Sequence, residues 1–449
     1  MTPETNQYWW KQAKIYELYI DKFADNIQGL TANLDYFVAL GINTLHILPH
    51  YPSPMVDDGY DISDYRAVRP ELGTLQDFQI LMSEARFRNI RIIVDLVLNH
   101  TSDMHPWFIE ARSSKHNPKR NYYLWSDTGA EFSEIEPAMP EVNDKIWTYN
   151  PDTDDYYFTK FYAAQPDLNW DNPDVFREMM DVMYYWADLG VSGFRLDAAP
   201  YLIKRAGSHS KGLPETHAII KKVRAALEQK YPNVILLAEA HQSIADTKKY
   251  FGDGDECHMV YHFSLMEQMW LALKSGDRDA VQAVIDESYE IPDACQWAIF
   301  LRNHDEVSLS TLQPGIRSAL VEFLDPQGLF HFRKGETASV RIGSVFRGDR
   351  VGMRKAFTLL YSLPGSPIMY YGDELGMSNL PHEESVIDSR KYVRGRFDWR
   401  LAEEQFNDPS SLFHEVALLI HGVPTEESET PPTTAHQLRG SVSSNEIHT

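Results

Sequence analysis

Four short stretches of this chain begin as apolar runs and end on acidic, basic or histidine side chains. They are residues 95–100 (DLVLNH), 193–198 (GFRLDA), 234–240 (VILLAEA) and 300–305 (FLRNHD). Runs of apolar and β-branched residues of this length are typical of strands buried on both faces of a parallel sheet. Because the carboxyl ends of such strands meet at one rim, the sequence predicts that these polar side chains gather at a single site.

Strand-like runs alternate with amphipathic helical patterns along most of the chain, which favours repeated strand–helix units. One helix is expected from Asn172 as its cap, through Pro173 and an apolar face that includes Trp186, to Gly190. Eight such runs predict a (β/α)8 TIM barrel in an α/β fold. The expected strands are residues 14–20, 44–48, 91–98, 193–196, 234–238, 259–263, 297–301 and 368–371.

Two segments interrupt this alternation. Residues 101–168 are rich in Asp, Pro, Tyr and Trp and are too long for an ordinary connection, so they are expected to form an inserted subdomain B after the third strand. Residues 312–350 carry a mixed pattern and are predicted to be a long irregular loop. The catalytic barrel is therefore assigned to residues 1–100 and 169–400.

The end of the chain is expected to lack a complete further domain. Residues 401–423 are interpreted as a remnant C-terminal segment. Residues 424–449 contain no aromatic residue and are rich in Pro, Ser, Thr and Glu, which predicts a disordered tail.

Charge and hydropathy exclude several classes of partner. The chain has 42 basic and 65 acidic residues, a net charge of −23, which argues against nucleic acid and anionic membranes and fits a neutral sugar. No apolar run reaches membrane-spanning length, and the first residues lack a basic segment followed by an apolar core. We expect a cytoplasmic protein without a membrane partner.

The chemistry is expected to come from carboxylates, because no group of Cys and His has zinc-ligand spacing. Cleavage of an acetal with retention needs one carboxylate as nucleophile and one carboxylic acid that protonates the leaving oxygen. Asp197 and Glu239, each at the end of a predicted strand, are the candidate pair. A single acid at a strand end more often caps a helix or pairs with a lysine, and only the surrounding motifs favour catalysis here.

Ordered motifs then identify a family. The chain resembles the alpha-amylase family of glycoside hydrolases through GINTLHILP, DLVLNH, QPDLN, GFRLDAA, LLAEA, FLRNHD and GSPIMYYGDE, in this order. The phrases FGDGDECHMVYHFSLM and DDGYDISDY are most similar to the branch of trehalose synthases. The resemblance extends from the second strand over most of the chain.

This resemblance implies roles for individual residues. Asp197 would be the nucleophile, Glu239 the general acid and then base, and Asp305 the third acid, which binds sugar hydroxyls. Arg195 would hold Asp197 ionised, since a nearby cation lowers the pKa of a carboxyl group. The histidines that bind the same sugar ring would be His100 and His304.

Further matches imply a pocket for short substrates. Asp58 would bind the outer end of a terminal glucose, Tyr60 would stack on its face, and Arg394 would pair with Asp58. The flanking Asp57 and Asp61 are interpreted as turn formers. His241, which follows the expected general acid Glu239, is interpreted either as a residue that supports the active-site residues from behind or as a packing residue.

Three functions remain open. The first is a retaining enzyme that transfers an α-glucosyl group and interconverts maltose and trehalose. The second is an α-glucosidase or maltooligosaccharide-hydrolysing α-amylase, and the third is a non-catalytic family member.

The resemblance implies no required cofactor. A calcium loop after the first strand is missing, but a calcium site that includes Asn99 stays open. A β-sandwich domain after the barrel is expected to be missing or truncated.

Overall fold

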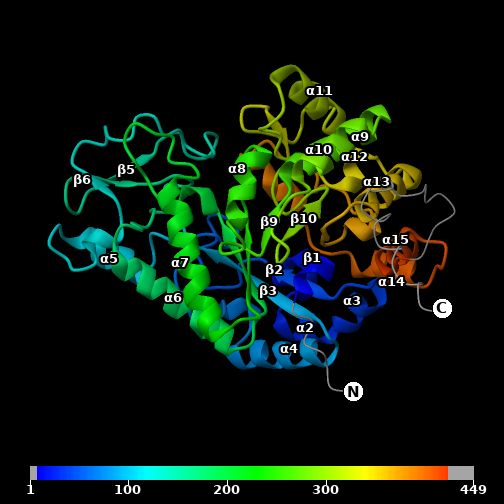
Figure 1. Ribbon diagram of the computed structural model, residues 1–449, viewed down its shortest axis with the longest axis horizontal. Helices are drawn as coiled ribbons and strands as arrows, with labels where there is room; N and C mark the ends of the chain where they lie inside the picture. Colours follow the sequence, from blue (N-terminus) through cyan, green and yellow to red (C-terminus); the bar gives the residue numbers. More distant parts are fainter. Residues whose placement is uncertain (1–7, 423–449) are drawn as a thin grey trace, which may run out of the picture.

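A closed barrel of eight parallel strands forms the centre of the molecule (Figure 1). The computed structural model describes residues 8–422. Each strand pairs with the one before and after it in the barrel, and β13 closes on β1. The predicted (β/α)8 fold is therefore confirmed. The barrel strands, in order, are β1 (Ile15–Leu18), β2 (Thr44–Ile47), β3 (Arg91–Val97), β7 (Gly193–Asp197), β8 (Ile235–Ala238), β9 (Met259–Tyr261), β10 (Gln296–Phe300) and β13 (Ser366–Tyr370).

Helices cover the outside of the barrel, as expected when both faces of a parallel sheet are buried. α6 shows why the sequence folds this way: the Asn172 side chain accepts from the Asp174 N–H, Pro173 is the first helical residue, and Trp186 lies on the buried face. The predicted cap and apolar face of this helix are confirmed. The helices of this layer are α1 (Ile20–Ala24), α2 (Ile27–Ala32), α3 (Leu34–Leu40), α4 (Leu75–Phe87), α6 (Pro173–Asp188), α7 (Pro214–Lys230), α8 (Ile244–Lys248), α9 (Phe263–Ser275), α10 (Asp279–Ser288) and α13 (Arg350–Ser362).

The long segment between β3 and α6 forms a small unit at one end of the molecule (Figure 1). It contains α5 (Pro106–Ser113) and an antiparallel sheet of β4 (Trp125–Ser126), β6 (Asp155–Phe158) and β5 (Trp147–Asn150). Its own apolar cluster centres on Ile135, Trp147 and Phe158.

The prediction that residues 312–350 form a long irregular loop was wrong. This segment contains α11 (Pro314–Leu324), a short hairpin of β11 (His331–Phe332) and β12 (Thr337–Ala338), and α12 (Ile342–Val345). Pro314 begins α11, and Leu320, Val321 and Leu324 form its buried face. The mixed polar composition after residue 325 hid these short elements, because neither the hairpin nor α12 is long enough to show a period.

Two helices follow the last barrel strand, α14 (Trp399–Phe406) and α15 (Leu412–His421). α15 packs against α3 and α13, so it lies in the outer helical layer of the barrel. Residues 8–422 contain no β-sandwich after the barrel. The predicted tail, residues 424–449, lies outside the described residues.

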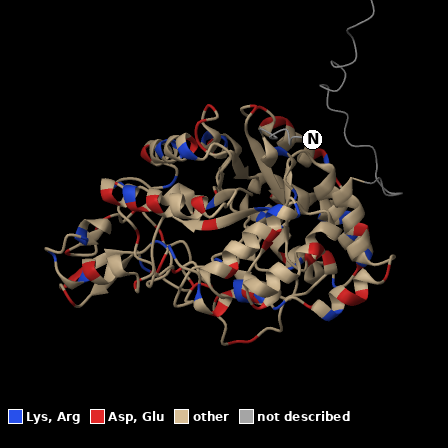
Figure 2. Ribbon diagram, turned by 90° about the horizontal axis from the view of Figure 1, so that it is seen from below, with Lys and Arg blue, Asp and Glu red and all other residues tan. Residues whose placement is uncertain are grey.

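Acidic and basic residues are interspersed over the barrel helices and the inserted unit (Figure 2). Within residues 8–422, every helix falls short of the length and apolar character that a bilayer crossing requires.

We expect α15 to be required for stability. Ile420 is 1% exposed, so Ile420→Ala should lower the free energy of unfolding by roughly 2–5 kcal/mol through lost burial and a residual cavity. Leu418→Ala on the exposed side of the same helix is the control and should change it by about 0.5 kcal/mol or less. Urea denaturation followed by fluorescence would measure both, and equal midpoints would contradict the packing of α15.

Candidate active site

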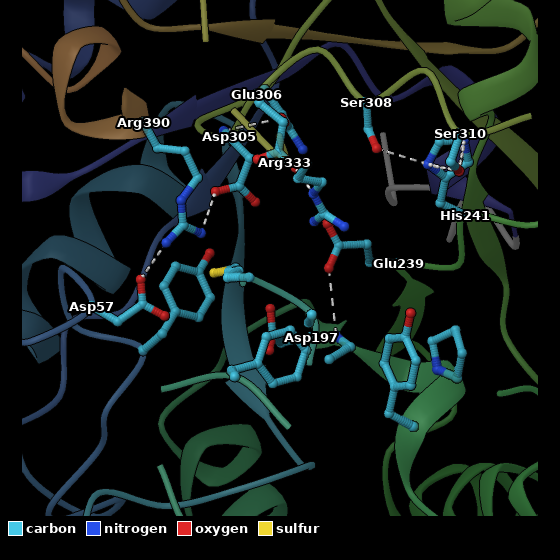
Figure 3. A pocket seen from close by; sticks show the side chains of 18 of the residues that line it. Asp57, Asp197, Glu239, His241, Asp305, Glu306, Ser308, Ser310, Arg333 and Arg390 are labelled. Carbon is cyan, nitrogen blue, oxygen red and sulfur yellow. Dashed lines mark hydrogen bonds and ion pairs between the residues drawn. The ribbon is translucent and has the colours of Figure 1, made fainter. Parts of the chain in front are cut away.

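The three predicted acids meet in one pocket at the carboxyl ends of the barrel strands (Figure 3). Asp197 is the last residue of β7, Glu239 follows β8, and Asp305 lies beyond β10. All three line the pocket, together with Tyr60 and His100. Arg195, His304 and Arg394 are not in this lining but contact Asp197 or Asp305. Asp58 in turn contacts Arg394.

Arg195 connects the two acids that are candidates for catalysis. Its Nη1 lies 2.6 Å from Asp197 Oδ1, and its Nη2 lies 2.8 Å from Glu239 Oε1. The Ala198 N–H also donates to Glu239 Oε2 at 3.4 Å. Since both nitrogens belong to one planar guanidinium, the two carboxylates lie side by side across a narrow space.

Burial dominates the protonation of this pair. It raises the pKa of Asp197 well above its usual value, because the charge of Arg195 offsets only part of the lost hydration and Glu239 repels a second negative charge. Burial also raises the pKa of Glu239, again against the opposing effect of Arg195. Arg195 lowers the pKa of both carboxyl groups, as expected of a nearby cation, but burial has the larger effect.

The environment of Asp305 lowers the pKa of its carboxyl group, in contrast to Asp197 and Glu239. Its Oδ1 lies 2.7 Å from Arg394 Nη2 and 3.2 Å from Arg390 Nη1. Burial would raise the pKa of the Asp305 carboxyl, but His304 and these two arginines hold it well below its usual range. Asp305 is therefore a fixed negative charge beside the pair.

The loop between β2 and α4 contributes two further acids. Arg394 Nη1 lies 2.5 Å from Asp58 Oδ2, the pairing that the resemblance implied. Asp57 does form a turn, since its carbonyl accepts from the Tyr60 N–H at 2.9 Å, but its carboxylate also lines the pocket and accepts from Arg390 at 2.9 Å. Asp61 does hold the turn, since it accepts from the N–H groups of Val56 and Asp57. Asp58 and Gly59 have φ values of 46° and 105°, a backbone conformation that Gly favours.

A buried hydrogen-bond network lies under the pocket, and the sequence did not predict it. The Tyr60 hydroxyl lies 2.9 Å from Asp95 Oδ2 and 2.7 Å from His304 Nε2. The rings of Tyr60 and His304 stack with their centroids 5.4 Å apart. Glu17 lies 3.0 Å from His304 Nδ1 and 3.1 Å from His46 Nδ1. These contacts fix the position of Tyr60. The only signal for this network was that Asp95 opens the DLVLNH motif.

His100 presents an open hydrogen-bonding position. Its Nδ1 lies 3.2 Å from Asn99 Nδ2, whereas its Nε2 is buried without a hydrogen-bond partner. Burial lowers the pKa of His100 to about 4, so the imidazole is neutral near pH 7. The side chain of His100 lines the pocket.

The surroundings of Asn99 do not fit a calcium ion. The Lys204 ammonium lies 2.9 Å from Asn99 Oδ1 and 2.5 Å from Asp167 Oδ2, and Asn99 Nδ2 donates to the same Asp167 oxygen at 2.9 Å. All three side chains are buried. Oxygens such as Asn99 Oδ1 and Asp167 Oδ2 are the ligands that calcium prefers. Here the ammonium group of Lys204 already binds both of them. Among residues 8–422, no group of three or more His, Cys, Asp or Glu is arranged to hold a metal ion.

The comparison with protein families gives one match: the alpha amylase catalytic domain, over residues 17–324. Among curated proteins, a trehalose synthase/amylase of Mycolicibacterium smegmatis is 42% identical over 411 residues, which cover 89% of this chain and 68% of that protein. A trehalose synthase of Thermus thermophilus is 42% identical over 87% of this chain but only 40% of its own length. An oligo-1,6-glucosidase of Heyndrickxia coagulans is 31% identical over 88% of this chain and 72% of that protein. This chain thus spans between two fifths and three quarters of these relatives.

Solved structures show the same likeness. A trehalulose synthase mutant in complex with Tris has a TM-score of 0.74 at 27% identity, covering 92% of this chain and 84% of that one. An isomaltulose synthase mutant from Erwinia rhapontici, in complex with its natural substrate sucrose, has a TM-score of 0.73 at 26% identity, covering 92% and 83%. Together these relatives support an enzyme that transfers an α-glucosyl group.

We predict that calcium does not contribute to the stability of this protein. Treatment with EDTA should leave the melting temperature unchanged, because Lys204 already neutralises Asp167. Lys204→Met should lower the free energy of unfolding by roughly 3–5 kcal/mol, since it leaves a buried carboxylate unpaired. Lys222→Met at an exposed position is the control. Thermal unfolding with and without EDTA would test this, and a fall in melting temperature with EDTA would contradict it.

Proposed function

Since the chain belongs to the alpha-amylase family of glycoside hydrolases, we propose that it acts on short α-glucosides by double displacement and interconverts maltose and trehalose. The observation that carries this proposal is the Asp197–Arg195–Glu239 arrangement on the wall of a pocket that Asp305 also lines. The identity of about 42% to trehalose synthases supports the choice of substrate.

The first half of the reaction uses both acids. The ionised carboxylate of Asp197 attacks the anomeric carbon, while Glu239, as carboxylic acid, gives its proton to the glycosidic oxygen. The glycosidic bond breaks, a glucosyl ester of Asp197 forms, and one glucose is released into the pocket. The raised pKa of Glu239 favours the carboxylic acid that this step requires, and Arg195 opposes the same effect of burial on Asp197.

In the second half, the released glucose returns through a different hydroxyl. Glu239, now ionised, takes the proton of that hydroxyl, the sugar oxygen attacks the anomeric carbon, and Asp197 leaves as carboxylate. Attack by the 1-hydroxyl gives trehalose, and attack by the 4-hydroxyl gives maltose. Glucose must be retained and water excluded between the two halves.

Asp305 and its arginines bind the glucosyl ring. A permanent negative charge beside the anomeric carbon favours the positively charged transition state, and its second oxygen is available to sugar hydroxyls. Asp57 and Arg390 pair in the lining on this side of the pocket, and the Asp58–Arg394 pair lies behind them. We infer that these pairs close this end and restrict the substrate to one glucose unit there, which supports disaccharides over long chains.

Hydrolysis of short α-glucosides is the alternative. It uses the same residues with water as the acceptor, and it is supported by the likeness to oligo-1,6-glucosidases. A product profile separates the two functions. The protein is incubated with maltose, and trehalose and glucose are quantified by chromatography. We expect trehalose as the main product; glucose alone would reject the interconversion.

We predict that Asp197→Asn and Glu239→Gln each lower kcat on maltose by roughly 10⁴-fold. Both changes keep the side-chain volume, so the melting temperature should stay close to that of the unmodified protein. Asp181→Asn on the exposed side of α6 is the matched control and should retain full activity. If both active-site variants kept substantial turnover, the assignment of the acids would be wrong.

Asp58→Ala should mainly weaken substrate binding. We expect about a tenfold increase in KM for maltose with a much smaller change in kcat, because Asp58 holds Arg394 at the closed end of the pocket and takes no part in proton transfer. Asp64→Ala, at an exposed position nearby, is the control. An unchanged KM would argue against the closed pocket.

A further inference from the structure

Glu17 lies at the centre of a buried chain in which carboxylates and imidazoles alternate. It belongs to β1 and is fully buried. Its Oε2 lies 3.1 Å from His46 Nδ1, and His46 Nε2 lies 3.3 Å from Asp95 Oδ2. Its Oε1 lies 3.0 Å from His304 Nδ1, and His304 Nε2 lies 3.3 Å from Asp305 Oδ2. The chain thus ends at an acid that lines the pocket.

The contact between Glu17 and His304 requires a proton on Nδ1. Burial alone would raise the pKa of Glu17, but His304 and His46 hold it well below its usual value, so this carboxylate is ionised. A carboxylate only accepts hydrogen bonds, and Nδ1 must therefore be the donor at 3.0 Å. The same oxygen accepts from the backbone N–H of His304 at 2.8 Å, which fixes the carboxylate against the ring.

The contacts of His304 Nε2 require a second proton. The Tyr60 hydroxyl has one proton for two contacts, with Asp95 Oδ2 at 2.9 Å and with Nε2 at 2.7 Å. Burial would raise the pKa of Asp95, but Arg195 holds it below its usual value, so Asp95 accepts and Tyr60 donates to it. Nε2 must then supply the proton of the shorter contact, and it also faces the carboxylate of Asp305. With protons on both nitrogens, the ring is an imidazolium.

The charges around His304 favour the same state. The ionisable groups that contact this residue or interact with it electrostatically are Glu17, Tyr19, Tyr60, Asp95, Glu239, Asp305 and Arg394. Arg394 donates to the His304 carbonyl at 3.1 Å, but its guanidinium is also paired with Asp58 and Asp305. Carboxylates at both ring nitrogens stabilise the charged form of an imidazole.

We propose that Glu17 is the positioning residue that keeps both ring nitrogens of His304 protonated, so that a cationic His304 orients Asp305 for the glucosyl ring. Glu17 is fully buried, so it acts through His304 and does not contact the substrate. This inference rests on the proposed function, because Asp305 is the acid assigned to that ring. It adds a residue from the first strand of the barrel, which supplies none of the predicted site residues.

The charge of His304 is measurable in the free protein. In protein labelled with nitrogen-15 histidine, the ring signals of His304 are those missing from the spectrum of His304→Gln. We expect both ring nitrogens of His304 to be protonated at pH 7 in the unmodified protein. An unprotonated ring nitrogen would overturn the proposal. This measurement requires neither a substrate nor a folded Glu17 variant.

Glu17→Gln keeps the side-chain volume and removes the charge. Because a nearby anion favours the charged imidazole, His304 should lose its second proton at a lower pH in this variant. We expect kcat/KM for 4-nitrophenyl α-D-glucoside to fall about tenfold at pH 8, as for one lost contact to a charged group. At about pH 5.5, roughly one unit below the usual pKa of histidine, it should lie within about twofold of the unmodified protein.

Two further variants make the result specific. Glu17→Asp keeps the charge and should recover part of the activity at pH 8. Glu374→Gln removes another fully buried carboxylate, which accepts from the hydroxyls of Tyr16 and Tyr36. It is the matched control and should change neither the His304 spectrum nor the ratio of activities at the two pH values.

An equal loss for Glu17→Gln at both pH values, or an unchanged His304 spectrum in that variant, would overturn the role of Glu17. Release of 4-nitrophenol measures only the first half of the reaction, which interconversion and hydrolysis share. Unmodified protein that converts maltose only to glucose would reject the interconversion and would leave this test unaffected, so the two failures are distinguishable.

Discussion

The buried guanidinium of Arg195 is the interaction on which the active site depends. It is fully buried, and it contacts Asp95, Asp197 and Glu239 at 3.0, 2.6 and 2.8 Å. A buried charge is tolerated only when it is paired and hydrogen-bonded, so this arginine requires acids on the neighbouring strands. Three acids around one cation cannot all be ionised at low cost.

Around this centre, ion pairs hold the other charged groups of the pocket in place. Arg390 pairs with Asp57 and Asp305, and Arg394 pairs with Asp58 and Asp305. On the other side of Glu239, His241 lies between the buried Glu267 and the hydroxyl of Ser308.

The barrel and the three acids were predictable because their signals are local. Eight apolar runs, each of a few residues, specify strands buried on both faces. Asp197 ends β7, Glu239 follows β8 directly, and Asp305 lies a few residues beyond β10. α11 was missed because its apolar face covers only three residues next to a polar segment. The role of Asp57 was missed because its partner, Arg390, lies more than three hundred residues away and no local pattern connects them.

The sequence by itself determined the fold class, the family resemblance and the identity of the acids, since these depend on periodicity and on short ordered motifs. Only the tertiary structure decided how those groups are charged. It placed Arg195 between two acids, Lys204 against Asn99 and Asp167, and His241 between Glu267 and two serines. The physical reason is that pKa values, ion pairs and hydrogen-bond direction depend on burial and on distances between residues far apart in the chain.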